Sequence, residues 1–211
     1  MKIVVCGMRG FVGNALHDFL SAQHHEVVPL SIRSHSSIEA IVKVLDGSDV
    51  VINLAGANIL GRWSASYKKL LRSSRLETTE ALTHALTHCS HPPSTLVNAS
   101  AVGVYDSYHQ HDEYSRNLGN DFLATLVQDW EETALSTRAL GTRVCIMRFG
   151  VVYGNGGGAM SKMLLPFKLG LGGKMGDVFQ MIYWIHLEDL VRGCLFLIEN
   201  QVLEVIFNLT T

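Results

Sequence analysis

Eight residues near the start of the chain, Cys6-Gly7-Met8-Arg9-Gly10-Phe11-Val12-Gly13, carry the pattern that predicts the fold. They follow a β-branched run at residues 2–5, typical of a buried parallel strand, and lead into apolar residues at helical spacing. Gly7 allows a tight turn, Gly10 a close approach of a pyrophosphate, and Gly13 close packing of helix on strand. The helix start supplies free N–H groups and a positive dipole for the anion. Strand, glycine turn and helix together favour a dinucleotide-binding site over an ordinary structural turn.

Composition and charge exclude several classes of protein. The 211 residues are 47% hydrophobic and 17% charged, and the net charge of −2 provides no electrostatic footprint for nucleic acid or an anionic membrane. No apolar run reaches the length of a membrane span, and no export signal precedes the first strand. Four scattered cysteines (Cys6, Cys89, Cys145 and Cys194) are typical of a reducing compartment. We therefore expect a cytoplasmic protein with a small-molecule substrate and with neither a nucleic-acid nor a membrane partner.

Predicted strands and helices alternate along the whole chain, which favours a parallel sheet with helices on both faces. The strands are expected at residues 2–5, 26–30, 49–54, 94–99, 143–149, 182–185 and 205–209. The helices are expected near residues 14–20, 37–45, 64–88, 121–140, 159–169 and 187–199. The predicted fold class is therefore α/β, a doubly wound parallel sheet of about seven strands. A homodimer is expected to form through the long helices.

Further motifs along the chain resemble those of one family. They are Asn53-Leu54-Ala55-Gly56, Ser73-Ser74-Arg75-x-x-x-Thr79, Ser100-Ala101-x-Gly103-x-Tyr105, Asp129-Trp130-Glu131, Arg148-Phe149-Gly150-Val151-Val152, Gly154-x-Gly156-Gly157-Gly158 and Trp184-Ile185-His186-x-x-Asp189-Leu190. With the glycine turn, they resemble the extended short-chain dehydrogenase/reductases, in the atypical branch of sugar-nucleotide epimerase-like proteins. The resemblance implies an NAD(P)-binding Rossmann domain over residues 1–211.

The resemblance also implies a small substrate lobe. Members of the family continue past the length of this chain into that lobe, so we expect residues 154–181 to form part of it and its C-terminal remainder to be truncated. Apolar residues that the lobe would cover, Met160, Met163, Leu164, Leu165 and Phe167, are then expected to form an exposed patch.

The second strand decides which nicotinamide cofactor is expected. An acidic residue at its end would bind the ribose hydroxyls of NAD, whereas an arginine accommodates the 2′-phosphate of NADP. No acidic residue stands there, but Arg33 does, and Arg9 projects from the glycine turn. These arginines predict NADP(H) in preference to NAD(H), with solvated surface arginines as the alternative. The residues expected to bind the cofactor are Gly7, Arg9, Gly10, Phe11, Val12, Gly13, Arg33, Leu54, Ala55, Gly56, Ala99, Ser100, Arg148 and Val151.

The catalytic residues are expected after the fourth predicted strand. The resemblance implies a serine or threonine there, together with a Tyr-x-x-x-Lys pair whose lysine assists proton transfer. Ser100 fits the hydroxyl role, and Tyr105 is the expected second catalytic residue, but no Tyr-x-x-x-Lys pair exists in the chain. Tyr105 therefore lacks an evident neighbouring cation in the sequence. Its alternative role is packing at the end of a strand.

The substrate is expected to meet Asn58, Trp63, Lys162, Trp184 and His186. A helix end with His84, His88, Cys89 and His91 suggests a metal site, since residues four apart share a helix face, but a polar helix end is the simpler interpretation. We therefore expect no metal site.

The leading hypothesis for the function is an atypical NADP(H)-dependent reductase or epimerase-like enzyme. Its substrate would be nucleotide-sugar-like or another small carbonyl or hydroxyl compound. The alternative is a catalytically silent NADP(H)-binding regulatory or scaffold protein, which the missing Tyr-x-x-x-Lys pair favours. Fold alone does not distinguish the two.

Overall fold

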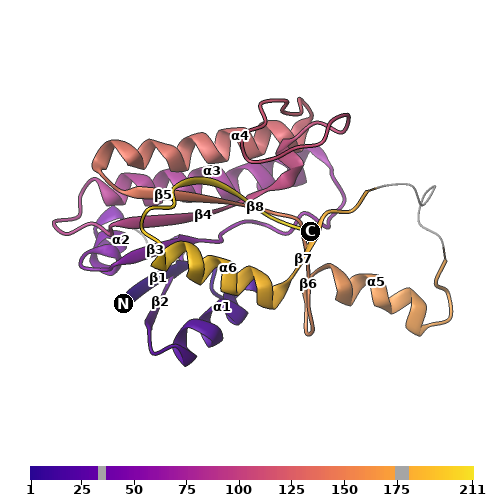
Figure 1. Cartoon of the computed structure of the whole chain (residues 1–211), viewed down its shortest axis with the longest axis horizontal. Helices are drawn as coiled ribbons and strands as arrows, with labels where there is room; N and C mark the ends of the chain where they lie inside the picture. Colours follow the sequence, from indigo (N-terminus) through magenta and orange to yellow (C-terminus); the bar gives the residue numbers. More distant parts are fainter. Residues whose placement is uncertain (33–36, 174–180) are drawn as a thin grey trace.

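Six parallel strands form the main sheet, in the order β2-β1-β3-β4-β5-β8 (Figure 1). The computed structural model describes residues 1–32, 37–173 and 181–211. The strands are β1 (Lys2–Cys6), β2 (Glu26–Leu30), β3 (Val50–Asn53), β4 (Thr95–Ala101), β5 (Arg143–Phe149) and β8 (Val205–Leu209). The predicted α/β, doubly wound parallel sheet is confirmed.

Helices cover both faces of this sheet. The helices of the described residues are α1 (Phe11–Ala22), α2 (Ile38–Leu45), α3 (Ala65–Leu86), α4 (Phe122–Leu135), α5 (Gly158–Lys168) and α6 (Leu187–Glu199), with 3₁₀ turns η2 (Val102–Val104) and η3 (Ser136–Leu140). Helices α1 and α6 lie on one face, and α2, α3 and α4 lie on the other (Figure 1).

The alternation of side chains along β1 explains why both faces need cover. Ile3 and Val5 pack among α1 and α6, whereas Val4 and Cys6 pack among α2 and α3, and all four are buried. A strand with apolar side chains on both faces is stable only when helices cover each of them. The continuous apolar run at the start of the chain therefore specifies a central strand of a three-layer structure.

The strand predicted at residues 182–185 lies outside the main sheet. It forms β7 (Trp184–His186) and pairs in parallel with β6 (Val151–Tyr153), a strand that the sequence pattern did not predict. Only Ile185 of β7 is buried, between an exposed tryptophan and an exposed histidine. This alternation is typical of a half-buried strand, so β7 belongs to a small two-stranded sheet beside the body.

Each edge of the main sheet carries a distinctive residue. Edge strand β2 contains Pro29, which has no backbone N–H and aligns with Val5 of β1. On edge strand β8, the backbone N–H of Asn208 donates to the side-chain Oε1 of Glu113 at 3.0 Å.

Helix α5 differs from the other helices because none of its eleven residues is buried. It projects from the body (Figure 1). Of the residues expected to form an exposed apolar patch, Leu164, Leu165 and Phe167 are 42–57% exposed, whereas Met160 and Met163 are half-buried. In the described part of the chain, no helix has the length and apolar character needed to cross a bilayer. The four cysteines, all of them described, are free thiols.

Candidate functional site

The glycine turn brings β1, α1 and the end of β3 into close contact. Gly7 has φ +81°, and a Cβ atom on it would lie 2.9 Å from the carbonyl of Leu54. The N–H of Gly10 donates to the carbonyl of Gly7 at 3.0 Å. A Cβ on Gly13 would overlap that same carbonyl, so α1 packs against the turn only because Gly13 has no side chain. The structure thus requires glycine at both positions.

The start of α1 is open toward this turn. Gly10 is the N-cap residue, and among the described residues no side chain accepts a hydrogen bond from the first turn of the helix. The first N–H groups of an α-helix have no partner within it, so they remain available to an anion. The ring of Phe11 packs against Gly157 and Gly158, and Val12 follows Phe11 in the first turn of α1.

Of the two arginines expected to recognise a 2′-phosphate, the structure describes one. Arg9 is exposed on the glycine turn and makes no ion pair or hydrogen bond with any described residue. Arg33 lies outside the described residues. A free guanidinium at this position is suited to a phosphate because it offers several N–H donors at once.

The end of β3 forms the second side of the cradle. Cys6 aligns with Asn53, so Leu54, Ala55 and Gly56 follow directly beside the glycine turn. The N–H of Leu54 donates to the carbonyl of Cys6 at 2.9 Å, and the N–H of Ala55 donates to Oδ1 of Asn53 at 3.2 Å. Two of the segments expected to bind cofactor, the glycine turn and residues 54–56, therefore meet at the carboxyl ends of adjacent strands, where open α/β sheets bind ligands.

Ser100 and Arg148 lie deeper, on adjacent positions of β4 and β5, and each is 3% exposed. The hydroxyl of Ser100 donates to Oε1 of Glu131 on α4. Arg148 donates to both oxygens of the same carboxylate, from Nε at 2.8 Å and from Nη2 at 2.6 Å. Glu131 thus holds the expected catalytic serine and the expected cofactor-binding arginine together in the interior.

Arg148 also reaches Tyr105, which corrects the expectation that this tyrosine lacks a neighbouring cation. Its Nη1 donates to the tyrosine hydroxyl at 2.8 Å, and its Cζ lies 4.9 Å from the ring centroid. The hydroxyl also contacts Oδ1 of Asn208 at 3.0 Å and the carbonyl of Asp112 at 2.9 Å. Burial acts to lower the pKa of Arg148, but the hydrogen bonds and charge of Glu131 outweigh it and hold that pKa above its usual value.

A cavity of about 560 Å³ opens beside Tyr105, at the carboxyl ends of β4 and β8. Its polar side is formed by Asp106, His109 and His111 from the loop that follows Tyr105. The ring of His111 stacks on that of Tyr105 with centroids 4.6 Å apart. Nδ1 of His109 and Nε2 of His111 both contact the Asp106 carboxylate, at 2.8 Å and 3.2 Å. The cavity therefore offers hydroxyl, carboxylate and imidazole groups within one polar wall.

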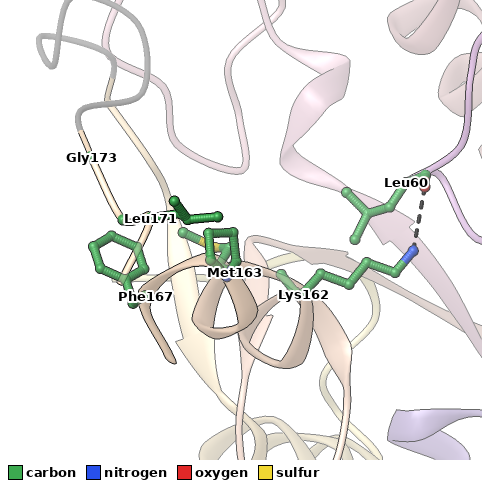
Figure 2. Close-up of a pocket in the computed structure, with 9 residues that line it drawn as sticks. Leu60, Lys162, Met163, Phe167, Leu171 and Gly173 are labelled. Carbon is green, nitrogen blue, oxygen red and sulfur yellow. Dashed lines mark hydrogen bonds between the residues drawn. The ribbon is translucent and has the colours of Figure 1, made fainter. Parts of the chain in front are cut away.

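The residues expected to meet the substrate lie in two groups. Lys162 lines a second, mostly apolar cavity of about 420 Å³, and its Nζ donates to the carbonyl of Leu60 at 3.4 Å (Figure 2). Leu60 belongs to the same turn as Asn58 and Trp63: the N–H of Leu60 donates to Oδ1 of Asn58 at 2.8 Å, and Nε1 of Trp63 donates to the carbonyl of Ile59 at 2.9 Å. The structure thus brings Asn58, Trp63 and Lys162 to one side of the molecule.

Trp184 and His186 form the other group, on β7. The ring of Trp184 lies 5.8 Å from that of Tyr153. The Nδ1 atom of His186 accepts the N–H of Glu188 at 3.3 Å, so His186 caps the start of α6. Of the other expected cofactor residues, Ala99 is buried in β4 and Val151 begins β6.

Two residues of the buried network were not assigned a role from the sequence. Glu131 follows Trp130 in the predicted helix, and both are buried in α4. Acidic residues are rarely buried without a partner, so a carboxylate at such a position indicates a buried cation next to it. Asn208 lies near the end of β8, where only the strand order brings it to Tyr105. Among the described histidines, cysteines and acidic residues, no three converge as metal ligands.

A model of the NAD dependent epimerase/dehydratase family matches residues 3–209. The chain belongs to this family. An epimerase family protein of Staphylococcus haemolyticus is 36% identical over 94% of the chain and 71% of its own length. One from Staphylococcus aureus strain N315 is 44% identical over 80% of the chain and 57% of its own length. The chain spans between 55% and 74% of the length of such epimerase-family relatives.

Solved structures of the epimerase family have the same fold. A human epimerase family protein, solved with NADPH, is 36% identical and superposes with a TM-score of 0.87. That comparison covers all of this chain and 74% of the human one. A nucleoside-diphosphate sugar epimerase from Corynebacterium glutamicum is 30% identical, with a TM-score of 0.82, and this chain covers 46% of it.

Proposed function

We propose that the protein is an NADP(H)-dependent reductase or epimerase-like enzyme acting on a nucleotide-sugar-like or other small carbonyl or hydroxyl substrate. The observation that carries this proposal is the glycine turn at the carboxyl ends of the strands. There, backbone without side chains lies next to the uncapped N-terminus of α1. Membership of the epimerase/dehydratase family supports it. So do the relative solved with NADPH and the relative described as a nucleoside-diphosphate sugar epimerase.

The residues at the turn fit a dinucleotide. Gly10 leaves the backbone bare where the diphosphate would approach, and the first N–H groups of α1 would hold the phosphate oxygens. Arg9, exposed and without a described partner, supports NADP(H) over NAD(H), because its guanidinium would bind the additional 2′-phosphate.

Tyr105 is the residue best placed to hold or move a proton at a substrate oxygen. When bound, the nicotinamide supplies hydride transfer to or from carbon. Tyr105 lines the larger cavity, and its hydroxyl is held by Arg148, whose positive charge would stabilise the oxygen after proton loss. Asp106 and His109 on the same wall would bind hydroxyl groups of a sugar-like substrate.

One observation favours the alternative of a silent NADP(H)-binding protein. The hydroxyl of Tyr105 already contacts three groups, on Arg148, Asn208 and Asp112, and the hydroxyl of Ser100 points at Glu131. Both hydroxyls must therefore exchange a partner before either contacts a substrate. A protein that binds the cofactor for regulation requires no such exchange.

Calorimetric titration with NADPH and NADH tests the cofactor half of the proposal. We expect NADPH to bind more tightly than NADH, and Gly10→Val to abolish binding while the circular dichroism spectrum is unchanged. Gly173→Val is the matched control, because a Cβ there meets no atom of a described residue within 4 Å. A wild-type protein that binds neither cofactor would contradict the proposal.

The loss of NADPH absorbance in the presence of aldehydes, ketones and nucleotide sugars tests the catalytic half. Turnover of any of these supports an enzyme, and Tyr105→Phe should then lower the rate by roughly 10²–10⁴-fold with NADPH affinity unchanged. Binding of NADPH with no turnover across the whole panel would support the silent protein instead.

A further inference from the structure

Polar side chains of helix α3 form hydrogen bonds to the loop that follows β3. Oγ of Ser74 accepts the N–H of Ala57 at 2.9 Å. Nη2 of Arg75 donates to the carbonyl of the same Ala57 at 3.1 Å, while Nη1 donates to the carbonyl of Leu71 at 3.2 Å. Two consecutive side chains of α3 therefore hold both polar backbone atoms of one loop residue.

A third residue of the motif holds the beginning of the same loop. Oγ1 of Thr79, one helical turn after Arg75, accepts Nδ2 of Asn53 at 2.9 Å and Nε1 of Trp130 at 2.9 Å. Asn53 in turn accepts the N–H of Ala55 at 3.2 Å. Residues 53–57 are thus fixed at both ends by α3.

This loop is one wall of the cradle formed by the glycine turn. Gly7 lies so close to the carbonyl of Leu54 that a Cβ atom on it would be only 2.9 Å away. Only a glycine fits at this position. A Cβ on Gly56 would lie 3.0 Å from Cζ of Arg75, so Gly56 is what allows Arg75 to reach Ala57. A shift of the loop by a fraction of an ångström would therefore change the width of the cradle.

Arg75 also carries a positive charge that no described carboxylate neutralises. Its guanidinium lies 5.3 Å from the ring of Trp130 and bonds only to backbone carbonyls among the described groups. Burial lowers the pKa of Arg75, which is the behaviour of a cation without a counter-ion. An anion bound at the nearby turn would supply the missing negative charge.

We propose that Ser74 and Arg75 are positioning residues for the dinucleotide: they hold residues 54–57 as the second wall of the cradle, and the charge of Arg75 favours its phosphates. This inference rests on the proposed function, and it gives a physical role to the Ser74-Arg75-x-x-x-Thr79 motif. Neither residue needs to touch the substrate for this role.

Calorimetric titration of NADPH into four variants tests the inference. Arg75→Met removes the hydrogen bonds and the charge, and we expect it to weaken NADPH binding by roughly 10- to 100-fold. Arg75→Lys keeps the charge and should restore part of the affinity, and Ser74→Ala should lose roughly 3- to 10-fold. Arg72→Met, on the exposed side of α3 and paired with Asp129, is the control and should bind as the wild type does.

The salt dependence of NADPH affinity separates a charge from a packing role. It should be weaker in Arg75→Met than in the wild type and should recover in Arg75→Lys, a difference that a loss of packing alone does not produce. If Arg75→Met fails to fold, Arg75→Lys and Ser74→Ala still decide. Wild-type affinity in folded Arg75→Met, or in both milder variants, would overturn the inference.

Hydrogen exchange of the Ala57 amide, measured without any cofactor, distinguishes the inference from the proposed function. Ser74→Ala should accelerate exchange at Ala57, and Arg72→Met should leave it unchanged. Unchanged exchange in Ser74→Ala would show that α3 does not hold the loop. If exchange is accelerated in Ser74→Ala but the wild type binds no NADPH, the contact between α3 and the loop is supported. The proposed function and the cofactor role of Ser74 and Arg75 are then both overturned.

Discussion

The ion pair between Arg148 and Glu131 is buried on both sides, so its stability depends on both residues being present. Both side chains are at most 7% exposed, so both charges have left water, and only their bidentate contact and the hydroxyls of Ser100 and Tyr105 replace the lost hydration. A buried pair of this kind is stabilising only while it is complete. Removing one partner leaves the other charge buried and uncompensated.

Arg148→Met should therefore lower the free energy of unfolding by about 3–5 kcal/mol, since Glu131 remains buried without its cation. Arg72→Met breaks the exposed Arg72–Asp129 pair and should cost at most about 1 kcal/mol. Urea denaturation of the two variants beside the wild type measures both values. Equal losses in the two variants would show that the buried pair contributes no more than a surface pair does.

Gly7 and Gly47 provide a matched test of the glycine turn. Both have positive φ, +81° and +69°, but a Cβ on Gly7 meets the backbone of Leu54, whereas a Cβ on Gly47 meets no described atom within 4 Å. Gly47→Ala should cost only the left-handed backbone strain of about 1–2 kcal/mol. Gly7→Ala should lower the melting temperature further and should also abolish NADPH binding. A Gly7→Ala protein as stable as Gly47→Ala would contradict the close contact with Leu54.

At the scale of elements, the loop after Tyr105 is organised by one carboxylate. Asp106 accepts the backbone N–H groups of Tyr108 and His109, at 2.9 Å and 3.1 Å, and the side chains of His109 and His111 also contact it. The N–H of Tyr108 contributes most to holding the pKa of Asp106 at about 2, followed by the hydrogen bond and charge of His109, against the opposing effect of burial. The loop is therefore fixed by an ionised Asp106.

The sign of the resulting pH dependence follows from this lowered pKa. A carboxylate whose pKa is lower in the folded state stabilises the fold above its unfolded pKa of about 3.9, and this stability is lost as pH falls toward 2. Asp106→Asn should therefore melt below the wild type at about pH 6, with the difference shrinking as pH approaches about 2. Melting curves of both proteins across this range test it. A difference that grows on acidification would contradict the assigned role.

At the scale of the whole molecule, burial is uneven. The sheet and the helices on its two faces enclose two large clusters of buried side chains, whereas α5 buries none. Helices gain most of their stability from packing an apolar face, and Pro166 further weakens α5 by removing a hydrogen-bond donor. The molecule thus combines a well-packed body with one weakly supported helix.

Hydrogen exchange followed by mass spectrometry should show this contrast. Amides of α5 should exchange close to the rate of an unstructured chain, while those of α6, which buries Leu190, Val191 and Cys194, should be strongly protected. The first 150 residues should resemble α6 in the described segments. Strong protection of α5 at concentrations where the protein is monomeric would contradict this prediction. Protection that appears only at high concentration would instead indicate self-association through its exposed apolar residues.

Local patterns predicted the fold well and the site in part. The glycine turn was predictable because strand, turn and helix are consecutive, so spacing alone carries the geometry. The contact between Arg148 and Tyr105 joins residues 43 positions apart and depends on β4 and β5 being neighbours, which no local pattern specifies. The pairing of β7 with β6 could not be predicted for the same reason, because it joins segments that are distant in the sequence. The Ser74-Arg75-x-x-x-Thr79 motif of α3 was evident in the sequence, but its hydrogen bonds to Ala57 were not.

The two sheet edges have a consequence for the behaviour of the protein at high concentration. An open parallel sheet exposes a row of unpaired backbone groups on each outer strand, and such rows recruit strands from other molecules into aggregates. On one outer strand, Pro29 withholds a donor that an incoming strand would need. On the other, Glu113 already occupies the N–H of Asn208 and places a carboxylate in the path of an approaching chain. Resistance to intermolecular strand addition is thus built into both margins of the sheet.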